Sequence, residues 1–329
     1  MNANNELLSI ADATARIRAG KYFSIAGDES ALAQLPRGNW IGGTIPYFMT
    51  AAGGCTSRDQ VFVTEIPAHG ETPRLRLCDL DALPMICHNA PDNGFTLLIL
   101  PAFSQAHERF AHDAPNYEDM YMKPLAGWIA GIHLDDLGKR TPKVFLGETG
   151  EMSDQVAAVI DVPLPAEKMA RIDIINLFRQ GDGDAITFTE AGFSAEHCLV
   201  NGQPAVLSDY LTALRIDTRL PLVADYCGAM INVSFKAVVP SEQRVDFYAP
   251  VFPGQVYRIA APVHDYVTAF QEAIPSGIDG LTFSCNCILN YLHSNLEGRR
   301  TAGVTGPITF GEIAYQLLNQ TLVYLSVEG

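Results

Sequence analysis

The sequence predicts an α+β fold of two packed halves, with large mixed or antiparallel sheets flanked by helices. Strand-like segments outnumber helical ones, and the two kinds follow no regular strand–helix alternation. Hydrophobic residues make up 48% of the 329 residues and charged residues 18%, which is typical of a globular protein. A chain of this length is longer than one simple core usually organises, so we expect two parts.

The N-terminal part is expected to begin with a helix and to continue with strands. Apolar residues at helical spacing from Leu7 to Ile17 predict the helix, and Gly20 can end it. Residues 104–112, directly after a strand-like run, predict a second helix. Runs rich in β-branched and aromatic residues predict strands at 21–27, 60–66, 74–80, 94–100, 127–134, 156–164 and 171–178.

The middle of the chain carries a turn signal and a helix start. Asn201-Gly202 predicts a tight turn, and Pro204 predicts the first turn of a helix with an apolar face up to Leu214. Strands dominate again beyond residue 217, apart from a short helix near 265–273. We therefore place the boundary between regions 1–216 and 217–329. No repeat with a period of 20–50 residues is visible.

Charge and targeting signals restrict the partners. The formal net charge is 22 − 37 = −15, which repels nucleic acid backbones and anionic membrane surfaces. The first twenty residues lack the cationic and apolar segments of a secretory signal, and the apolar run 94–103 is too short to span a bilayer. Seven cysteines, an odd number, suit reduced thiols. We expect a cytoplasmic protein that binds neither nucleic acid nor membranes.

The strand-like run "LTFSCNC", residues 281–287, places two cysteines on one face. Their Cα atoms would lie roughly 6.6–6.8 Å apart, at the outer limit of disulfide geometry. Buried, inert thiols are one interpretation. The alternative is a cysteine-dependent hydrolase or transferase in which Cys285 attacks an acyl or amide substrate. It requires a nearby base, for which His293 is the candidate in sequence.

Other chemical motifs give little signal. The sequence has no metal-ligand spacing, no G-x-S-x-G elbow and no phosphate-binding glycine loop, so no metal site is predicted. Glu312 lies between Phe310 and Ile313. A carboxylate in so apolar a run is either at an edge or paired inside a site.

The C-terminal motifs carry a resemblance to a known family. "LTFSCNC", the later "GPITFGEIA" and "LNQTLVYLSV" resemble the C-terminal part of the FIST family, which are bacterial sensory domains of intracellular signal transduction. "CLVNGQPAVLSDYL" and "NWIGGTIPYFM" are similar to earlier parts of that family. The resemblance covers residues 20–326 and makes 1–216 the FIST N-terminal-like region and 217–329 the C-terminal-like region.

The resemblance implies a stand-alone sensor that binds a small molecule, an amino acid or a relative of one, and signals through a separate partner protein. Combined with strand alternation, it places Ser284 and Asn286 in the pocket with Cys285 at its edge. Glu312 is expected to pair with a ligand amine, and Thr44 to contribute from the glycine-rich segment. No cofactor is expected. Some members resemble haem-based gas sensors, so haem with His293 as axial ligand stays an alternative, although no C-x-x-C-H motif occurs.

Overall fold

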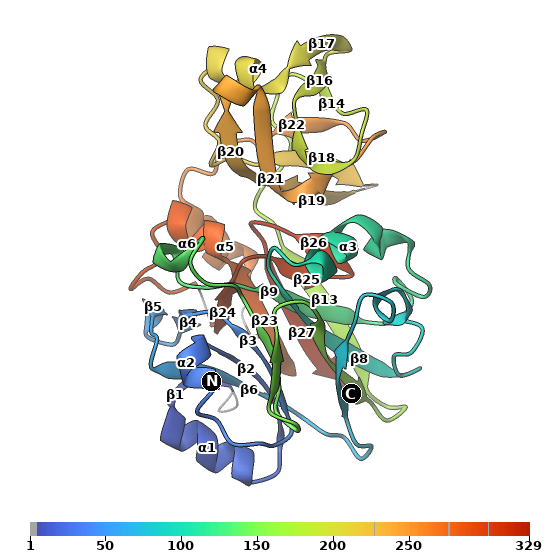
Figure 1. Ribbon diagram of the computed structural model, residues 1–329, viewed down its shortest axis with the longest axis vertical. Helices are drawn as coiled ribbons and strands as arrows, with labels where there is room; N and C mark the ends of the chain where they lie inside the picture. The colour runs from blue at the N-terminus through green and yellow to red at the C-terminus, as the bar shows by residue number, and fades with distance from the viewer. Residues whose placement is uncertain (1–4, 227, 276, 302) are drawn as a thin grey trace. The chain divides into compact units, whose positions relative to one another are not determined.

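The protein has an α+β fold, as the sequence predicts. The computed structural model describes residues 5–226, 228–275, 277–301 and 303–329, and it divides the chain into two compact units (Figure 1). Unit 1 comprises the chain up to Ile175 together with residues 270–317 and 321–329, and unit 2 comprises residues 176–269 and 318–320. The boundary predicted at 216/217 falls inside unit 2, because the chain leaves unit 1 at Ile175 and returns at Phe270.

Unit 1 is built from one arrangement of strands that occurs three times. Each repeat begins with a leading strand, which is followed by a second strand, a helix and a third strand parallel to the second. A two-stranded hairpin comes next. The repeat ends with a closing strand that pairs with the leading strand and with the second strand. The first repeat consists of β1 (Asn5–Ser9), β2 (Tyr22–Gly27), α2 (Glu29–Leu32), β3 (Trp40–Thr44), β4 (Tyr47–Thr50), β5 (Gly53–Thr56) and β6 (Gln60–Ile66), with α1 (Ile10–Arg18) between its first two strands.

The other two repeats have the same order of elements. The second consists of β7 (Arg74–Cys78), β8 (Gly94–Pro101), α3 (Gln105–Asp113), β9 (Leu125–Ala130), β10 (Val144–Leu146), β11 (Glu151–Ser153) and β12 (Ala157–Pro163), with 3-10 turns η1 (Leu83–Met85), η2 (Ala114–Asn116) and η3 (Leu134–Asp136). The third consists of β13 (Met169–Ile175), β23 (Leu281–Cys287), α6 (Ile288–His293), β24 (Gly306–Thr309), β25 (Glu312–Ala314), β26 (Gln316–Leu318) and β27 (Leu322–Glu328).

The repeats exchange their hairpins in a closed cycle. Among the described residues of unit 1, the strands form three six-stranded sheets, each with four strands from one repeat and a hairpin from another. Their orders are β1-β6-β2-β3-β10-β11, β7-β12-β8-β9-β25-β26 and β13-β27-β23-β24-β4-β5. Each sheet therefore has one parallel pair, β2/β3, β8/β9 or β23/β24, and is otherwise antiparallel. The exchange ties the three repeats into one core.

Close backbone approach makes glycine necessary in this core. A Cβ on Gly127 in β9 would lie 1.9 Å from the carbonyl oxygen of Leu98 in β8. A Cβ on Gly43 in β3 would lie 2.6 Å from the ring of Trp128, which is buried. These two glycines let the parallel strands and the central tryptophan pack at the observed distances.

Unit 2 is inserted between the leading strand and the next strand of the third repeat. Its described residues form two sheets, of orders β17-β16-β14-β22-β18-β19 and β15-β21-β20, around a core that includes Phe188, Phe247 and Tyr257. Its elements are β14 (Ile186–Thr187), β15 (Gly192–Ala195), β16 (His197–Val200), β17 (Gln203–Val206), α4 (Leu207–Ala213), β18 (Leu222–Tyr226), β19 (Ala229–Val233), β20 (Phe235–Val239), η4 (Pro240–Glu242), β21 (Arg244–Val251) and β22 (Tyr257–Ile259). The helix α5 (Tyr266–Ala273) follows, at the return to unit 1.

Two expected helices begin later than the sequence predicts. Residues 5–9 form β1 and pair with β6, and the helix begins at Ile10 because the hydroxyl of Ser9 accepts a hydrogen bond from the N–H of Asp12. Pro204 lies in β17 and not in a helix. The turn at Asn201-Gly202, with φ values of 50° and 80°, closes a hairpin, so the chain continues as a strand until α4.

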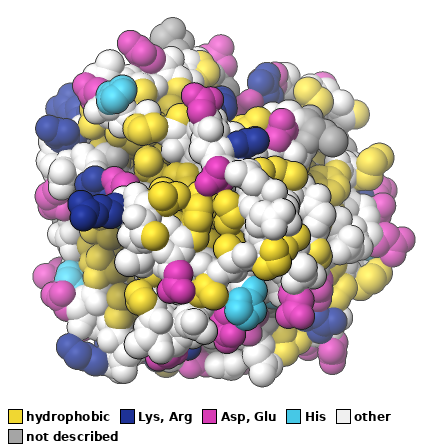
Figure 2. Space-filling view, turned by 90° about the horizontal axis from the view of Figure 1, so that it is seen from above, with side chains coloured by type: hydrophobic (Ala, Val, Ile, Leu, Met, Phe, Trp, Pro, Cys, Tyr) yellow, Lys and Arg dark blue, Asp and Glu magenta, His cyan; other side chains and the backbone are white. Residues whose placement is uncertain are grey.

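The surface carries charges of both signs. Figure 2 shows Asp and Glu side chains interspersed with Lys and Arg over the viewed face, with hydrophobic side chains between them. None of the helices in the described part of the chain has both the length and the apolar character needed to cross a bilayer.

Candidate functional site

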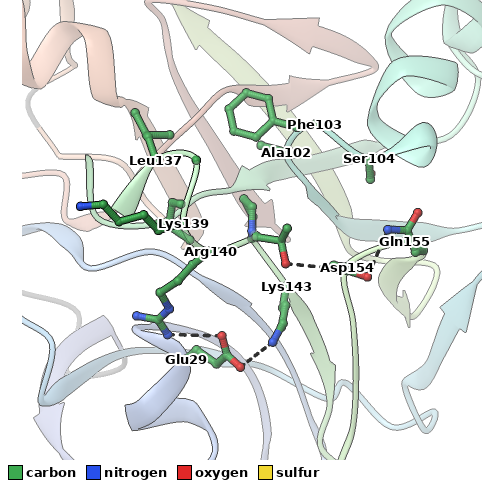
Figure 3. Close-up of a pocket in the computed structure, with 14 residues that line it drawn as sticks. Glu29, Ala102, Phe103, Ser104, Leu137, Lys139, Arg140, Lys143, Asp154 and Gln155 are labelled. Carbon is green, nitrogen blue, oxygen red and sulfur yellow. Dashed lines mark hydrogen bonds and ion pairs between the residues drawn. The ribbon is translucent and has the colours of Figure 1, made fainter. Parts of the chain in front are cut away.

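A cavity of about 600 Å³ lies in unit 1, at the carboxyl ends of the parallel strands β8 and β9 (Figure 3). Its described lining comes from the start of α2, the turn between β8 and α3, the segment between β9 and β10, and the loop after β11. The lining residues are Glu29, Ala102, Phe103, Ser104, Ile132, Leu137, Gly138, Lys139, Arg140, Thr141, Pro142, Lys143, Asp154 and Gln155. Carboxyl ends of parallel strands are a common position for ligand sites.

The cavity arises where the second repeat departs from the other two. Residues 131–143 connect β9 to β10, whereas residues 45–46 make the equivalent connection in the first repeat and residues 310–311 in the third. The long connection supplies about half of the lining residues. An extension confined to one copy of a repeated framework is a feature of functional loops more than of structural ones.

Thr44 forms hydrogen bonds with both ends of the 131–143 segment. Its hydroxyl accepts a hydrogen bond from the N–H of Lys143 at 2.9 Å, and its own N–H donates to the carbonyl of Lys143 at 2.9 Å. Its carbonyl accepts from the N–H of Gly131 at 2.7 Å. The sequence prediction placed Thr44 in the pocket as a ligand contact. The structure buries it behind the pocket wall, where it positions the wall.

Two cations converge on one carboxylate at the base of the cavity. Lys143 Nζ lies 2.6 Å and Arg140 Nη2 3.3 Å from the carboxylate oxygens of Glu29. Figure 3 marks both ion pairs with dashed lines. Arg140 also lies 3.3 Å from Asp28, whose carboxylate accepts from the N–H of Ser30 and caps α2. These partly buried ion pairs hold the 131–143 segment against α2.

A second carboxylate, Asp154, lies on another wall. It accepts hydrogen bonds from Gln155 Nε2 and from the hydroxyl of Thr141, both at 3.1 Å. The hydrogen bond from Gln155 lowers the pKa of the Asp154 carboxyl, and the hydrogen bond from Thr141 lowers it further. The carboxyl is therefore ionised at neutral pH. The cavity lining therefore carries charges of both signs, and the cations among them, Lys143 and Arg140, are paired with Glu29.

Apart from Ser104 and Lys139, the remaining lining is apolar, and one residue in it is strained. Ala102, Ile132, Leu137 and Pro142 flank Phe103, which has φ 67°. An aromatic residue in this left-handed region costs about 1–3 kcal/mol relative to ordinary backbone. Such strain persists only where the surrounding structure enforces it, and it is common at functional sites.

The predicted residues on β23 lie together but around a much smaller space. Ser284, Cys285 and Asn286 line a cavity of about 10 Å³, which is room for one water molecule. The hydroxyl of Ser284 donates to the carbonyl of Thr305, and the Asn286 side-chain oxygen accepts from the N–H of Cys287 and from Asn290. This space does not hold a molecule the size of an amino acid.

Cys285 has the environment of a structural thiol. It is buried, and its Sγ–H donates to the carbonyl of Gly127 at 3.4 Å. Burial, reinforced by the nearby Glu312 carboxyl, raises the pKa of the Cys285 thiol well above its usual value. A nucleophilic cysteine needs access and a lowered pKa. The geometry therefore favours the inert interpretation over the hydrolase or transferase alternative.

Glu312 is buried next to these cysteines and away from the 600 Å³ cavity. One carboxylate oxygen accepts from the N–H and the hydroxyl of Thr321, at 3.2 and 2.8 Å, and the hydroxyl of Thr309 lies 3.3 Å from the other. Burial raises the pKa of the Glu312 carboxyl to about 8, against the opposing effect of those hydrogen bonds. Its predicted pairing with a ligand amine has no counterpart in the lining of either cavity.

Sequence reasoning did not find the residues of the large cavity. Phe103, Arg140, Lys143, Glu29 and Asp154 belong to no motif and come from four separate segments. The available signal was the long charged segment "LDDLGKRTPK", residues 134–143, directly after a buried strand. This segment stands out only when it is compared with the two-residue connections at the same place in the other repeats, and the sequence does not reveal those repeats.

One group of potential metal ligands lies on the surface of the described chain. The ligand atoms of His88, Glu118 and Asp119 lie within 4.8 Å of one another, and all three side chains are at least partly exposed. His88 Nδ1 is 3.4 Å from each carboxylate. The cluster lies outside the lining of both cavities and adds nothing to the ligand site.

Comparison with known proteins gives one family. No curated protein matches this chain. A family model described as a family of unknown function, DUF6976, matches residues 8–328, and the chain therefore belongs to that family.

Proposed function

We propose that this protein is a cytoplasmic small-ligand-binding protein whose binding site is the 600 Å³ cavity of unit 1. The observation that carries the proposal is the extension of residues 131–143, which lines the 600 Å³ cavity in the second repeat and replaces the two-residue connections 45–46 and 310–311 of the other repeats. Its volume lies within the range usual for small-molecule sites, and its lining combines apolar side chains with a few fixed charges.

An amino acid or a related small molecule is the proposed ligand class. The Lys143 and Arg140 cations and the Asp154 carboxylate offer partners to both charged groups of a zwitterion. The resemblance to FIST sensory domains suggests the same class and a sensory role, with the signal passed to a separate partner protein. The net charge of −15 disfavours nucleic acid and membrane surfaces as partners.

Neither alternative activity has comparable support. The hydrolase or transferase alternative requires a reactive Cys285, whose burial and raised pKa oppose it. A haem sensor requires an axial ligand, and the described residues that line the large cavity include no His, Cys, Met or Tyr. His293, at the end of α6, is outside that lining.

A thermal-shift screen tests the proposal, because a ligand that binds only the folded protein raises its melting temperature. The screen uses amino acids, small carboxylates and haem, with an absorption spectrum recorded first. We expect a saturable increase for at least one amino acid or carboxylate and no Soret band. The increase should be weakened in Gln155→Trp, which adds a bulky side chain to the cavity lining, and persist in Met152→Trp, an exposed position outside it. A flat screen, or equal shifts in both variants, would overturn the proposal.

A further inference from the structure

Phe103 occupies a turn position that aromatic residues rarely adopt. Residues 101–104 form a turn closed by the N–H of Ser104 and the carbonyl of Pro101, and Phe103 is its third residue. A positive φ at this position, here 67°, is normally left to glycine or asparagine. The Phe103 side chain is nonetheless 49% exposed, so burial of the ring does not account for keeping an aromatic residue here.

The surrounding contacts enforce the strained conformation. The N–H of Phe103 donates to His107 Nδ1 at 3.3 Å, and the hydroxyl of Ser104 caps α3 by accepting from the N–H of His107. In the first repeat, the connection from strand to helix consists of Asp28 alone. In the third repeat, β23 is followed by α6 with no residue between them. The strained turn thus belongs to the repeat that contains the cavity.

The turn directs the Phe103 ring to the cavity. Strained strand-to-helix turns are used elsewhere to present a functional side chain at the top of a sheet. Here the ring stands at the cavity in Figure 3, opposite the charged groups around Glu29. It makes an edge-to-face contact with Phe310, with ring centroids 6.2 Å apart and planes at 67°, and Phe103 is still 49% exposed.

We propose that Phe103 is a ligand-contacting residue and that the cavity selects polar molecules carrying a flat, unsaturated ring, which packs on Phe103 while the charged walls bind the polar end. The inference rests on the proposed function and adds the ligand's shape to it. Aromatic pairs attract beyond the area that they bury, so the ring supplies a preference that the apolar neighbours Leu137 and Ile132 alone do not.

Matched ligand pairs and a pair of substitutions test this inference. Isothermal titration compares phenylalanine with alanine and benzoate with acetate, each against wild type, Phe103→Ala and the control Met122→Ala, an exposed apolar position outside the cavity. We expect the ring-bearing member of a pair to bind wild type at least about tenfold more tightly, and Phe103→Ala to lose that preference while Met122→Ala keeps it. Equal binding of both members, or a preference unchanged in Phe103→Ala, would overturn the inference and leave the proposed function standing. No binding of any probe to wild type would overturn both.

The melting temperature without ligand gives a second, independent readout. Phe103→Gly and Phe103→Ala both remove the ring, but only glycine adopts φ 67° without strain. We expect Phe103→Gly to melt at a higher temperature than Phe103→Ala although neither shows the ring preference. A lower melting temperature for Phe103→Gly would show that the turn is unstrained. It would contradict the premise that the strained backbone of Phe103 lowers the stability of the protein in order to place the ring for ligand binding.

Discussion

Glu312 and Thr321 form a closed hydrogen-bonding pair in the core of unit 1. One oxygen of the carboxyl accepts from both the N–H and the hydroxyl of Thr321, at 3.2 and 2.8 Å, and ties β25 to the start of β27. The surroundings exclude water and include the thiols of Cys285 and Cys287, so the carboxyl is preferentially protonated. A buried acid in this position makes the stability of the unit depend on pH.

The pKa of Glu312 predicts the sign of that dependence. The folded-state pKa of about 8 is above the ordinary value of 4.5, so folding favours the protonated form. Its contribution is complete below pH 4.5 and is lost as the pH rises toward 8. We expect the free energy of unfolding of wild type to fall between pH 5 and pH 9 by an amount on the order of a few kcal/mol.

Glu312→Gln should flatten this pH profile, because the amide oxygen still accepts from Thr321 but does not titrate. Urea unfolding at several pH values measures it. Glu71→Gln, at an exposed position, serves as the control and should keep the wild-type slope. A residual slope in Glu312→Gln is expected from Asp161, whose carboxyl pKa burial also raises. An unchanged slope in Glu312→Gln would show that this carboxyl is ionised in the folded protein.

Thiol labelling should separate the structural cysteines from the accessible ones. Cys285 and Cys287 are buried, whereas Cys55 is partly exposed. We expect iodoacetamide to modify Cys55 before the other cysteines of the described residues and to reach Cys285 only when the protein unfolds, as mass spectrometry of peptides would show. Rapid modification of Cys285 in the folded protein would restore the enzyme alternative.

Thr44→Val should loosen the wall of the large cavity. The substitution removes the hydroxyl that accepts from the N–H of Lys143 and keeps the side-chain volume, so the expected loss of stability is only about 1 kcal/mol. Release of the 131–143 segment should accelerate tryptic cleavage after Lys139 and Arg140. Thr44→Ser keeps the hydroxyl and should resist cleavage as wild type does. Equal cleavage of the two variants would show that the hydroxyl does not hold the segment.

Gly127→Ala should destabilise unit 1 strongly. Its Cβ would lie 1.9 Å from the carbonyl oxygen of Leu98, so β8 and β9 would have to separate. We expect the free energy of unfolding to fall by about 3 kcal/mol, as for severe overpacking. Gly183→Ala meets no atom within 4 Å and should change it by about 0.5 kcal/mol or less. Similar effects of the two substitutions would contradict the close approach of the strands.

The sequence predicts many individual elements because their signals are local. The runs at 60–66 and 281–287 form strands with those bounds, and Ser104 begins a helix as expected. The threefold repetition was invisible, because the copies span residues 5–66, 74–163, and 169–175 with 281–328. Their connections differ in length, and unit 2 interrupts the third copy.

The candidate site could not be predicted for a related reason. Strand alternation predicts Ser284 and Asn286 on one face, and both line the 10 Å³ cavity together with Cys285, but the volume of that cavity is set by side chains from distant segments. Glu29 and Lys143 meet only because the second repeat's hairpin adds to the first repeat's sheet. The position of Phe103 depends on a positive φ that no sequence pattern predicts for phenylalanine.

The central claim is that the cavity beside residues 131–143 binds a small ligand, and isothermal titration tests it most directly. The strongest ligand from the thermal-shift screen is titrated into wild type, Gln155→Trp and Met152→Trp. The account predicts one site per chain in wild type and Met152→Trp, and a loss of at least about tenfold in affinity in Gln155→Trp, which adds an indole to the cavity lining. Equal affinity for all three proteins would place the binding site elsewhere and contradict the account.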